Sequence, residues 1–241
     1  MDIIRLESAS STNTWVSLNE KDLPTKAFVY SVSQTAGRGQ RGNSWESEPG
    51  KNITASVLFH PLDFPAINQF FLSEAFSMAI IDFLSGYGVK AKVKWPNDIY
   101  VGDKKICGIL VEHVVTGKNI SRTIAGFGIN INQTVFLSDA PNPVSLSLIT
   151  GEKYDLEELI QDLATIIENY LSELGKVSLI HQKFMKMMWR NDHNFYKFVD
   201  RKQNEGLEAR IHDVAPTGIL TIETRNGELR EYAFKEVEFV I

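Results

Sequence analysis

The sequence has few of the residues that build disulfide frameworks or thiolate metal centres. Its one cysteine, Cys107, cannot form an internal disulfide, which is typical of proteins from a reducing compartment. An excess of basic residues is also absent, because 25 lysines and arginines stand against 30 acidic residues and give a formal net charge of −5. Nucleic-acid binding domains usually carry a basic surface, so this charge balance argues against a DNA partner.

Long uninterrupted apolar runs are missing too. The most apolar region, residues 66–84, contains Asn68, Gln69, Glu74 and Asp82, which would be costly at the centre of a bilayer. It therefore predicts a buried core helix. The N-terminus has an acidic second residue and no apolar segment of the kind found in secretory signals. We expect a cytoplasmic protein with no membrane partner.

The residues that are present predict a mixed α+β domain followed by a small β-structure. Residues 26–34, 52–60, 89–95 and 122–132 have the β-branched and aromatic content of strands, whereas 66–84, 154–174 and 177–189 have helical periodicity. Asp155, followed by an acidic first turn, opens the second of these helices. From about residue 192 the chain changes to short strands separated by glycine and proline turn signals. We expect a main domain over 1–190 and a small C-terminal β-barrel over 191–241, packed on the main domain.

Residues 98–101 and 104–112 predict a hairpin with a two-residue turn, in which Gly102 supplies the positive φ. The predicted register pairs Val101 with Lys104, Tyr100 with Lys105, Asp98 with Cys107, and Asn97 with Gly108. It places Asp98, Tyr100, Lys105 and Cys107 on one side of the sheet. A carboxylate and an ammonium group therefore meet near the end of the strand.

The segment Gly37-Arg-Gly-Gln-Arg-Gly42 joins two predicted strands and contains almost nothing that could fill a core. Its alternating glycines expose backbone N–H groups, and its arginines offer guanidinium groups that suit phosphate or carboxylate. An anionic ligand fits this pattern, but a mobile glycine loop or an RNA contact would look similar. The segment is neither a Rossmann fingerprint nor a Walker A loop, because it opens no predicted helix.

Two further polar segments are ambiguous when they are taken alone. Lys94-Trp-Pro-Asn-Asp98 ends a predicted strand, and its Asn and Asp side chains could line a site or satisfy their own turn. Ser10-Ser-Thr-Asn13 could cap a helix, or its hydroxyl and amide groups could line a pocket for a neutral ligand that donates and accepts hydrogen bonds.

Taken together, the motifs resemble those of biotin protein ligases. The matching segments are Ser11-Thr-Asn13, Gln34 with residues 37–42 and Trp45, residues 94–98, residues 105–112 and residues 126–130, in the order and spacing of that family. The resemblance covers about 1–190 and implies a mainly antiparallel mixed sheet flanked by helices, as in class II synthetases. The C-terminal part resembles the family's SH3-like domain. The sequence is most similar to the monofunctional type, which has no N-terminal DNA-binding domain.

The resemblance also implies roles for individual residues. The implied biotin-binding residues are Ser11, Thr12, Asn13, Gln34, Gly37, Arg38, Gln40, Lys105 and Gly108. The implied ATP-binding residues are Arg38, Arg41, Trp45, Asn97, Lys105 and Asn130. The implied catalytic residues are Lys105, Arg38 and Asp98. Gln40 and Asn43 depart from the family pattern, because many relatives carry arginines there, so retention of an adenylate would rest more on Arg38, Arg41 and Lys105.

The implied reaction joins biotin and ATP to give biotinyl-5′-AMP, with Mg²⁺ as the activating ion, and transfers biotin to a lysine of a biotin carboxyl carrier protein. Lipoate and octanoate ligases or transferases of the same fold are the nearest alternative. A binding module without activity is a second alternative, and a biotin-responsive repressor is disfavoured because the first pocket motif lies about ten residues from Met1. A homodimer is expected by analogy with relatives. The sequence does not indicate which residues hold a metal ion.

Overall fold

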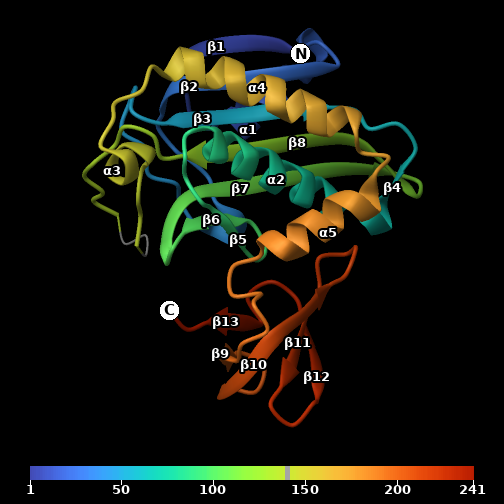
Figure 1. Ribbon diagram of the computed structural model, residues 1–241. Helices are drawn as coiled ribbons and strands as arrows, with labels where there is room; N and C mark the ends of the chain where they lie inside the picture. The colour runs from blue at the N-terminus through green and yellow to red at the C-terminus, as the bar shows by residue number, and fades with distance from the viewer. Residues whose placement is uncertain (139–141) are drawn as a thin grey trace.

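The computed structural model describes residues 1–138 and 142–241, except for the side chain of Arg41. The described residues form a large mixed sheet with helices on both of its faces, and a second, smaller sheet lies at one end of this layered body (Figure 1). The predicted α+β class is confirmed. The expected boundary between residues 190 and 191 falls between the last helix and the first strand of the smaller sheet.

The large sheet is antiparallel except for one parallel pair at its edge. Its strands are β1 (Asp2–Ala9), β2 (Lys26–Gln34), β3 (Ile53–Phe59), β4 (Phe64–Pro65), β5 (Lys92–Lys94), β6 (Asp98–Val101), β7 (Lys104–Thr116) and β8 (Asn119–Ile129). They follow the order β1-β2-β3-β8-β7-β6-β5, with β4 paired to β8. Among the described strands of this sheet, only β1 and β2 run parallel. Three of the polar motifs lie at strand ends, because residues 10–13 follow β1, residues 37–42 follow β2, and residues 94–98 join β5 to β6.

The two faces of this sheet differ in chemistry because side chains alternate along each strand. On β3, Val57 belongs to the main hydrophobic core, whereas Ser56 points to the opposite face. On β8, Phe127 belongs to the core and its neighbours Gly126 and Gly128 belong to the opposite face. One face therefore packs against helices, and the other carries hydroxyl groups and glycines.

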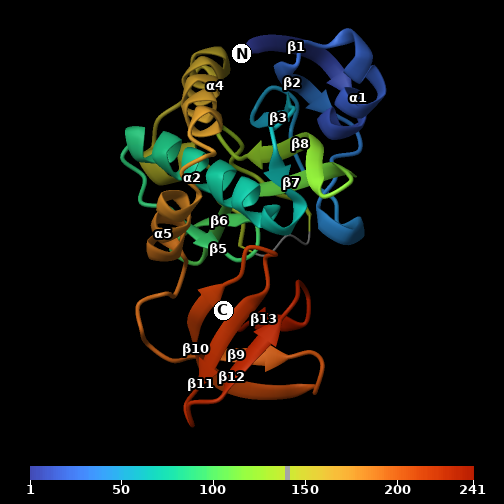
Figure 2. The ribbon, with the colours of Figure 1, turned by 90° about the vertical axis from the view of Figure 1, so that its right-hand side faces the viewer.

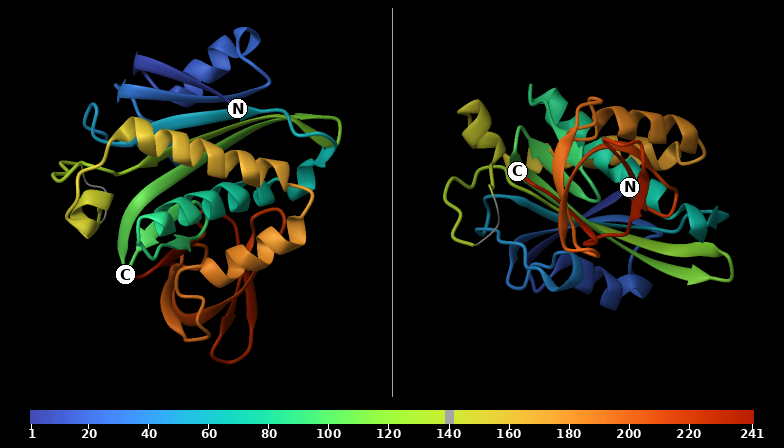
Figure 3. Two further views of the ribbon diagram at one scale, coloured as in Figure 1. Left: turned by 45° about the horizontal axis from the view of Figure 1, so that its top comes forward. Right: turned by 90° about the horizontal axis from the view of Figure 1, so that it is seen from below.

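Three helices cover the apolar face, and one helix covers part of the polar face. The helices are α1 (Thr12–Asn19), α2 (Phe70–Gly86), α3 (Leu146–Thr150), α4 (Leu156–Ser172) and α5 (Val177–Met187). In Figure 2, α1 lies on the side of the sheet opposite α2 and α4. The left view of Figure 3 shows α4 and α2 side by side across the sheet. Helix α4 begins at the predicted N-cap Asp155, whose carboxylate accepts hydrogen bonds from the next turn.

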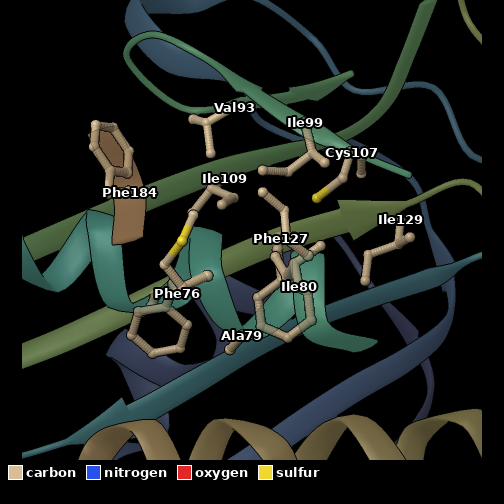
Figure 4. Packing of buried hydrophobic residues seen from close by; sticks show 14 of the residues in the cluster. Phe76, Ala79, Ile80, Val93, Ile99, Cys107, Ile109, Phe127, Ile129 and Phe184 are labelled. Atoms are coloured by element: carbon tan, nitrogen blue, oxygen red, sulfur yellow. The ribbon is translucent and has the colours of Figure 1, made fainter. Parts of the chain in front are cut away.

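Helix α2 is the predicted core helix, and its burial confirms that prediction. Phe76 and Ile80 pack over Ile109 and Phe127 of the sheet (Figure 4), and all four side chains are buried. By length and composition the stretch Ala66–Gly86 could also cross a membrane, but 67% of its apolar window is buried inside the fold. Such burial is what a core helix shows.

The β6–β7 hairpin has the predicted turn but only part of the predicted register. Tyr100 faces Lys105 as expected, and Gly102 has a φ of 58°. A β-bulge at Ile106 then shifts the pairing by one residue, so Asp98 faces Gly108 and not Cys107. The predictions that Cys107 shares a side with Asp98 and that Asn97 faces Gly108 were wrong. Cys107 instead lies in the hydrophobic core, where burial raises the pKa of its thiol.

The smaller sheet contains five antiparallel strands and packs on the end of the large one. The strands are β9 (Tyr196–Asp200), β10 (Glu205–Val214), β11 (Leu220–Thr224), β12 (Leu229–Tyr232) and β13 (Val237–Phe239), in the order β12-β11-β10-β9-β13. Among the described residues β12 and β13 do not pair with each other, so the expected barrel is not closed. The right view of Figure 3 looks up at the large sheet past this smaller one.

A turn of the smaller sheet fixes the junction between the two parts. The Trp95 Nε1–H group donates to the carbonyl of Gly218 at 3.1 Å, and the Phe70 N–H group donates to the carbonyl of Pro216 at 3.1 Å. Gly218 has a φ of 90°, and a Cβ atom there would lie 2.8 Å from the Phe70 ring. Only glycine meets both conditions, so this turn packs closely against the main domain.

A buried acid at this junction predicts a pH-dependent stability. Glu74 on α2 is fully buried, and burial raises its pKa to about 7, although a 2.9 Å contact with His181 on α5 acts in the opposite direction. His181 also faces Asp213 of the smaller sheet at 3.5 Å. The folded state therefore holds the Glu74 proton more tightly than the unfolded state does. The stability that this proton contributes is complete below pH 4.5 and is lost as the pH rises through 7.

We therefore expect the free energy of unfolding to fall between pH 5 and pH 8. In the Glu74→Gln variant this decrease should be smaller by up to about 3 kcal/mol. Urea denaturation of both proteins at several pH values measures it. The matched control is Glu152→Gln, which removes an exposed carboxylate. If the free energy of unfolding changed with pH in the same way in wild type and in Glu74→Gln, the raised pKa of Glu74 would be contradicted.

Candidate active site

A cavity of about 610 Å³ lies on the polar face of the large sheet. The arginine loop, defined as residues 37–45, covers one side of it, and the smaller sheet borders the other. The cavity brings together eleven residues that the sequence analysis singled out as candidate site residues. They are Ser11, Thr12, Asn13, Gln34, Arg38, Gln40, Trp45, Asn97, Asp98, Lys105 and Gly108.

One end of the cavity is polar and uncharged. Ser11 occupies the N-cap position of α1, but its side chain makes no capping hydrogen bond. The Gln34 side-chain oxygen accepts from the Thr12 N–H group at 2.8 Å and from the Thr12 hydroxyl at 3.2 Å. Within the described chain, neither the Ser11 hydroxyl nor the Gln34 amide nitrogen forms a hydrogen bond. This end therefore offers hydrogen bonds to a neutral polar ligand.

Asn13 lines the same end, but its amide is fully engaged within the protein. Its nitrogen donates to Glu112 at 2.8 Å and to the Leu110 carbonyl at 3.2 Å, and its oxygen accepts from the Ser56 hydroxyl at 2.6 Å. A Cβ atom on Gly126 would lie 2.1 Å from this oxygen. Gly126 thus makes room for Asn13, and Asn13 holds the floor of the cavity in shape.

The arginine loop is a small hairpin with its own hydrogen bonds. The Trp45 N–H group donates to the Gly37 carbonyl at 3.0 Å, and the Gly39 N–H group donates to the Asn43 carbonyl at 2.7 Å. The Arg38 guanidinium forms an ion pair with Glu112 at 2.8 Å and donates to the Thr14 hydroxyl at 3.3 Å. The loop therefore borders the cavity, and Arg38, which lines it, is held by two residues outside the lining.

The cationic centre of the cavity is Lys105. Its Nζ lies 2.7 Å from Asp98 Oδ1, and it faces the Trp45 ring with 5.5 Å between Nζ and the ring centre. The predicted meeting of Lys105 with Asp98 is confirmed, although the register differs. Asn97 is held next to them, because its backbone carbonyl accepts from the Ile109 N–H group at 2.9 Å and its side-chain amide donates to the Ile109 carbonyl at 2.5 Å.

The Trp45 indole packs on two facing glycines. Gly108 and Gly128 pair across β7 and β8, and Cβ atoms on them would lie 3.0 Å and 2.2 Å from the indole. The Trp45 Nε1–H group is buried and has no partner within the described chain. The Trp45 ring, packed on bare backbone, therefore lies beside Lys105.

Some predicted site residues lie elsewhere. Gly37 supports the loop hairpin behind the lining, and a Cβ atom there would lie 2.5 Å from the Trp45 carbonyl. Asn130 is buried behind the cavity, where its nitrogen donates to the Val144 carbonyl at 3.1 Å and its oxygen has no described partner. The Arg41 side chain lies outside the described residues. Ligand contacts of these three residues remain predictions.

The smaller sheet contributes lining residues that the sequence analysis missed. They are Arg201, Phe234, Lys235, Val237, Glu238 and Phe239. Lys94 points toward this border, with its Nζ 4.9 Å from the Tyr100 ring centre and 5.9 Å from that of Phe239, and burial lowers its pKa. No local sequence pattern marks these aromatic residues as site residues, because the fold alone brings them there. The cavity is thus a junction between both parts of the chain.

The described side chains include no group of three or more histidine, cysteine or acidic residues that could hold a metal ion by themselves. Two carboxylates, Asp98 and Glu238, do line the cavity. Mg²⁺ usually binds through one or two protein carboxylates together with substrate phosphates and water. The cavity therefore suits an ion that arrives with a phosphate ligand.

This fold and site define a domain with a cavity on the polar face of a mixed sheet, in which two cations lie beside a neutral polar end. The family model described as "Biotin/lipoate A/B protein ligase family" matches residues 5–130. The chain belongs to this family.

Individual relatives agree with this assignment. The bifunctional ligase/repressor BirA of Bacillus spizizenii is 32% identical over 236 residues, which cover 93% of this chain and 70% of the relative. The biotin–[acetyl-CoA-carboxylase] ligase of Paracoccus denitrificans is 29% identical, over 70% of this chain and 72% of that one. The solved structure of the Aquifex aeolicus biotin protein ligase in complex with biotin and ATP superposes with a TM-score of 0.79 at 21% identity, and 99% of each chain is covered.

Proposed function

We propose that this protein is a biotin protein ligase, which activates biotin with ATP and transfers it to a lysine of a biotin carboxyl carrier domain. The observation that carries the proposal is the arrangement of the cavity. A neutral hydrogen-bonding end formed by Ser11, Thr12 and Gln34 lies in the same cavity as the cations Arg38 and Lys105. Biotin has a neutral ureido ring at one end and a carboxylate at the other, so it matches both ends.

In the first half-reaction, an oxygen of the biotin carboxylate attacks the α-phosphorus of MgATP, and the bond to the β-phosphate oxygen breaks to release pyrophosphate. The carboxylate is already ionised at neutral pH, so no general base is needed. The barrier is repulsion between two anions. Lys105 and Arg38 offset it with fixed positive charge directed at the α-phosphate, which is the kind of preorganised stabilisation that works in a water-poor site.

The nucleotide would lie against the second half of the cavity. Trp45 offers a planar face to adenine, and Gly108 and Gly128 leave its indole room to lie close to the backbone. Mg²⁺ enters as part of the MgATP substrate, with Asp98 and Glu238 as the carboxylates that would meet it. Closure of the arginine loop would keep water away from the mixed anhydride.

In the second half-reaction, the amine of the acceptor lysine attacks the acyl carbon, and the bond to AMP breaks. The attacking nitrogen must lose a proton, and Asp98 is the carboxylate placed to accept it or to orient the amine. Asp98 lies 2.7 Å from Lys105, so the same side chain also holds the catalytic cation in place.

The Asp98→Asn variant separates these two roles of Asp98. We expect transfer from preformed biotinyl-5′-AMP to a carrier domain to slow by about a hundredfold, the contribution typical of a positioned general base. Rapid mixing of the variant with adenylate and carrier domain measures the step without the first half-reaction. An unchanged transfer rate would leave Asp98 only its contact with Lys105.

Lipoate or octanoate ligation is the alternative within the same family. An apolar acyl chain would leave the Ser11 hydroxyl and the Gln34 amide nitrogen without partners, which costs affinity. Calorimetric titration with biotin, lipoate and octanoate therefore distinguishes the ligands. Binding of lipoate without binding of biotin would favour the alternative.

Activity is tested by incubating the protein with ATP, Mg²⁺ and a carboxyl carrier domain, with or without biotin. We expect pyrophosphate release that depends on biotin, followed by a mass increase of the carrier domain that corresponds to one biotin. Tight binding of biotin and ATP without pyrophosphate would indicate a binding module and overturn the proposal.

A further inference from the structure

Glu112 lies on β7 just behind the cavity and does not line it. Its two carboxylate oxygens contact two different lining residues. Oε1 accepts from Arg38 of the arginine loop at 2.8 Å, and Oε2 accepts from the Asn13 side chain at 2.8 Å. One carboxylate therefore connects the arginine loop to Asn13 in the floor of the cavity.

The Arg38 guanidinium depends on this contact for its direction. Its side chain is 48% exposed, and within the described chain its only other side-chain hydrogen bond is the longer one to Thr14, at 3.3 Å. A long exposed arginine samples many rotamers unless an acceptor fixes it. Glu112 supplies that acceptor from a strand of the sheet, which is more rigid than the loop itself.

The Asn13 end of the contact is fixed more firmly. Asn13 is 3% exposed and is also held by Ser56 and by the Leu110 carbonyl. Glu112 is therefore held in place by Asn13 and in turn holds the Arg38 guanidinium. Both carboxylate oxygens serve as acceptors, so glutamine cannot replace Glu112 without turning a donor toward either Arg38 or Asn13.

We propose that Glu112 is a positioning residue, which holds the arginine loop closed and aims Arg38 at the anionic part of the ligand. The expected effect on adenylate formation rests on the proposed function, whereas the expected effect on the position of the arginine loop does not. In the Glu112→Gln variant, the Arg38 guanidinium loses its fixed direction, and the arginine loop loses its connection through Glu112 to Asn13.

A double-mutant cycle tests the kinetic consequence. We expect Glu112→Gln to slow biotin-dependent pyrophosphate release about tenfold and to speed the escape of biotinyl-5′-AMP by a similar factor. In an Arg38→Met background the glutamine can turn its carbonyl to Asn13, so the same substitution should change neither rate. Equal effects in both backgrounds would overturn the proposal, because Glu112 would then act independently of Arg38.

Limited proteolysis tests the structural consequence in the ligand-free protein and requires no enzymatic activity. Trypsin cleavage after Arg38, identified by mass spectrometry, should be several-fold faster in Glu112→Gln than in wild type. The control is Glu208→Gln, which breaks an exposed ion pair with Arg225 in the smaller sheet and should leave cleavage after Arg38 unchanged. An unchanged cleavage rate in Glu112→Gln, with the melting temperature retained, would show that Glu112 does not hold the arginine loop. This conclusion would stand even if the protein proved not to be a ligase.

Discussion

Replacing Lys105 with alanine is expected to slow adenylate formation at least about a hundredfold. The Lys105 ammonium is the central cation of the cavity, held 2.7 Å from Asp98 and facing the Trp45 ring. When a carboxylate approaches a phosphate, a fixed donor of this kind contributes about 3 to 4 kcal/mol to the transition state, or two to three orders of magnitude in rate. Single-turnover pyrophosphate release with saturating biotin and ATP measures the loss.

Lys104 provides a matched control for this experiment. It precedes Lys105 on the same strand, but it is exposed and does not line the cavity. The Lys104→Ala variant should therefore form adenylate at the wild-type rate. Wild-type adenylate formation by Lys105→Ala would remove Lys105 from the mechanism.

Replacing Gly126 with alanine is expected to destroy the polar end of the cavity. The new Cβ atom would lie 2.1 Å from the Asn13 side-chain oxygen, and Asn13 cannot yield freely because Ser56 and Glu112 both hold it. Overpacking of this kind costs about 1 to 3 kcal/mol of folding stability. We also expect biotin affinity to fall by more than about tenfold, because the floor beside Thr12 is displaced.

Two measurements check this prediction, namely thermal unfolding and calorimetric titration with biotin. The control is Gly206→Ala, since Gly206 is an exposed residue at the start of β10, and a Cβ atom there would meet nothing within 4 Å. That variant should match wild type in both measurements. Wild-type biotin affinity in Gly126→Ala would show that Asn13 does not shape the binding site.

Most of the fold could be predicted from local sequence patterns. The strand 26–34 matches β2 residue for residue, and the core helix and the Asp155 cap lie where periodicity and capping place them. The β6–β7 register could not be predicted, because the bulge at Ile106 depends on tertiary packing of two consecutive buried residues, Ile106 and Cys107. The smaller sheet was expected as a closed barrel, and the described strands do not close.

The candidate site was predictable where its residues occur in short polar motifs. The arginine loop, Lys94-Trp-Pro-Asn-Asp98 and Lys105 are unusual enough in composition to attract attention by themselves. Glu112 and Phe239 are not, because a glutamate on a strand and an aromatic residue in a small sheet look like ordinary surface and core residues. Their roles depend on distances across the fold, which no local pattern contains.

The central claim is that Arg38 and Lys105 converge on the anionic junction between a biotin carboxylate and a nucleotide phosphate. A crystal structure of the protein with a non-hydrolysable analogue of biotinyl-5′-AMP tests it most directly. We predict that the Lys105 ammonium and the Arg38 guanidinium lie within hydrogen-bonding distance of the oxygens at that junction, with the ureido ring against Ser11, Thr12 and Gln34. A bound analogue whose junction lies beyond the reach of both cations would contradict the account.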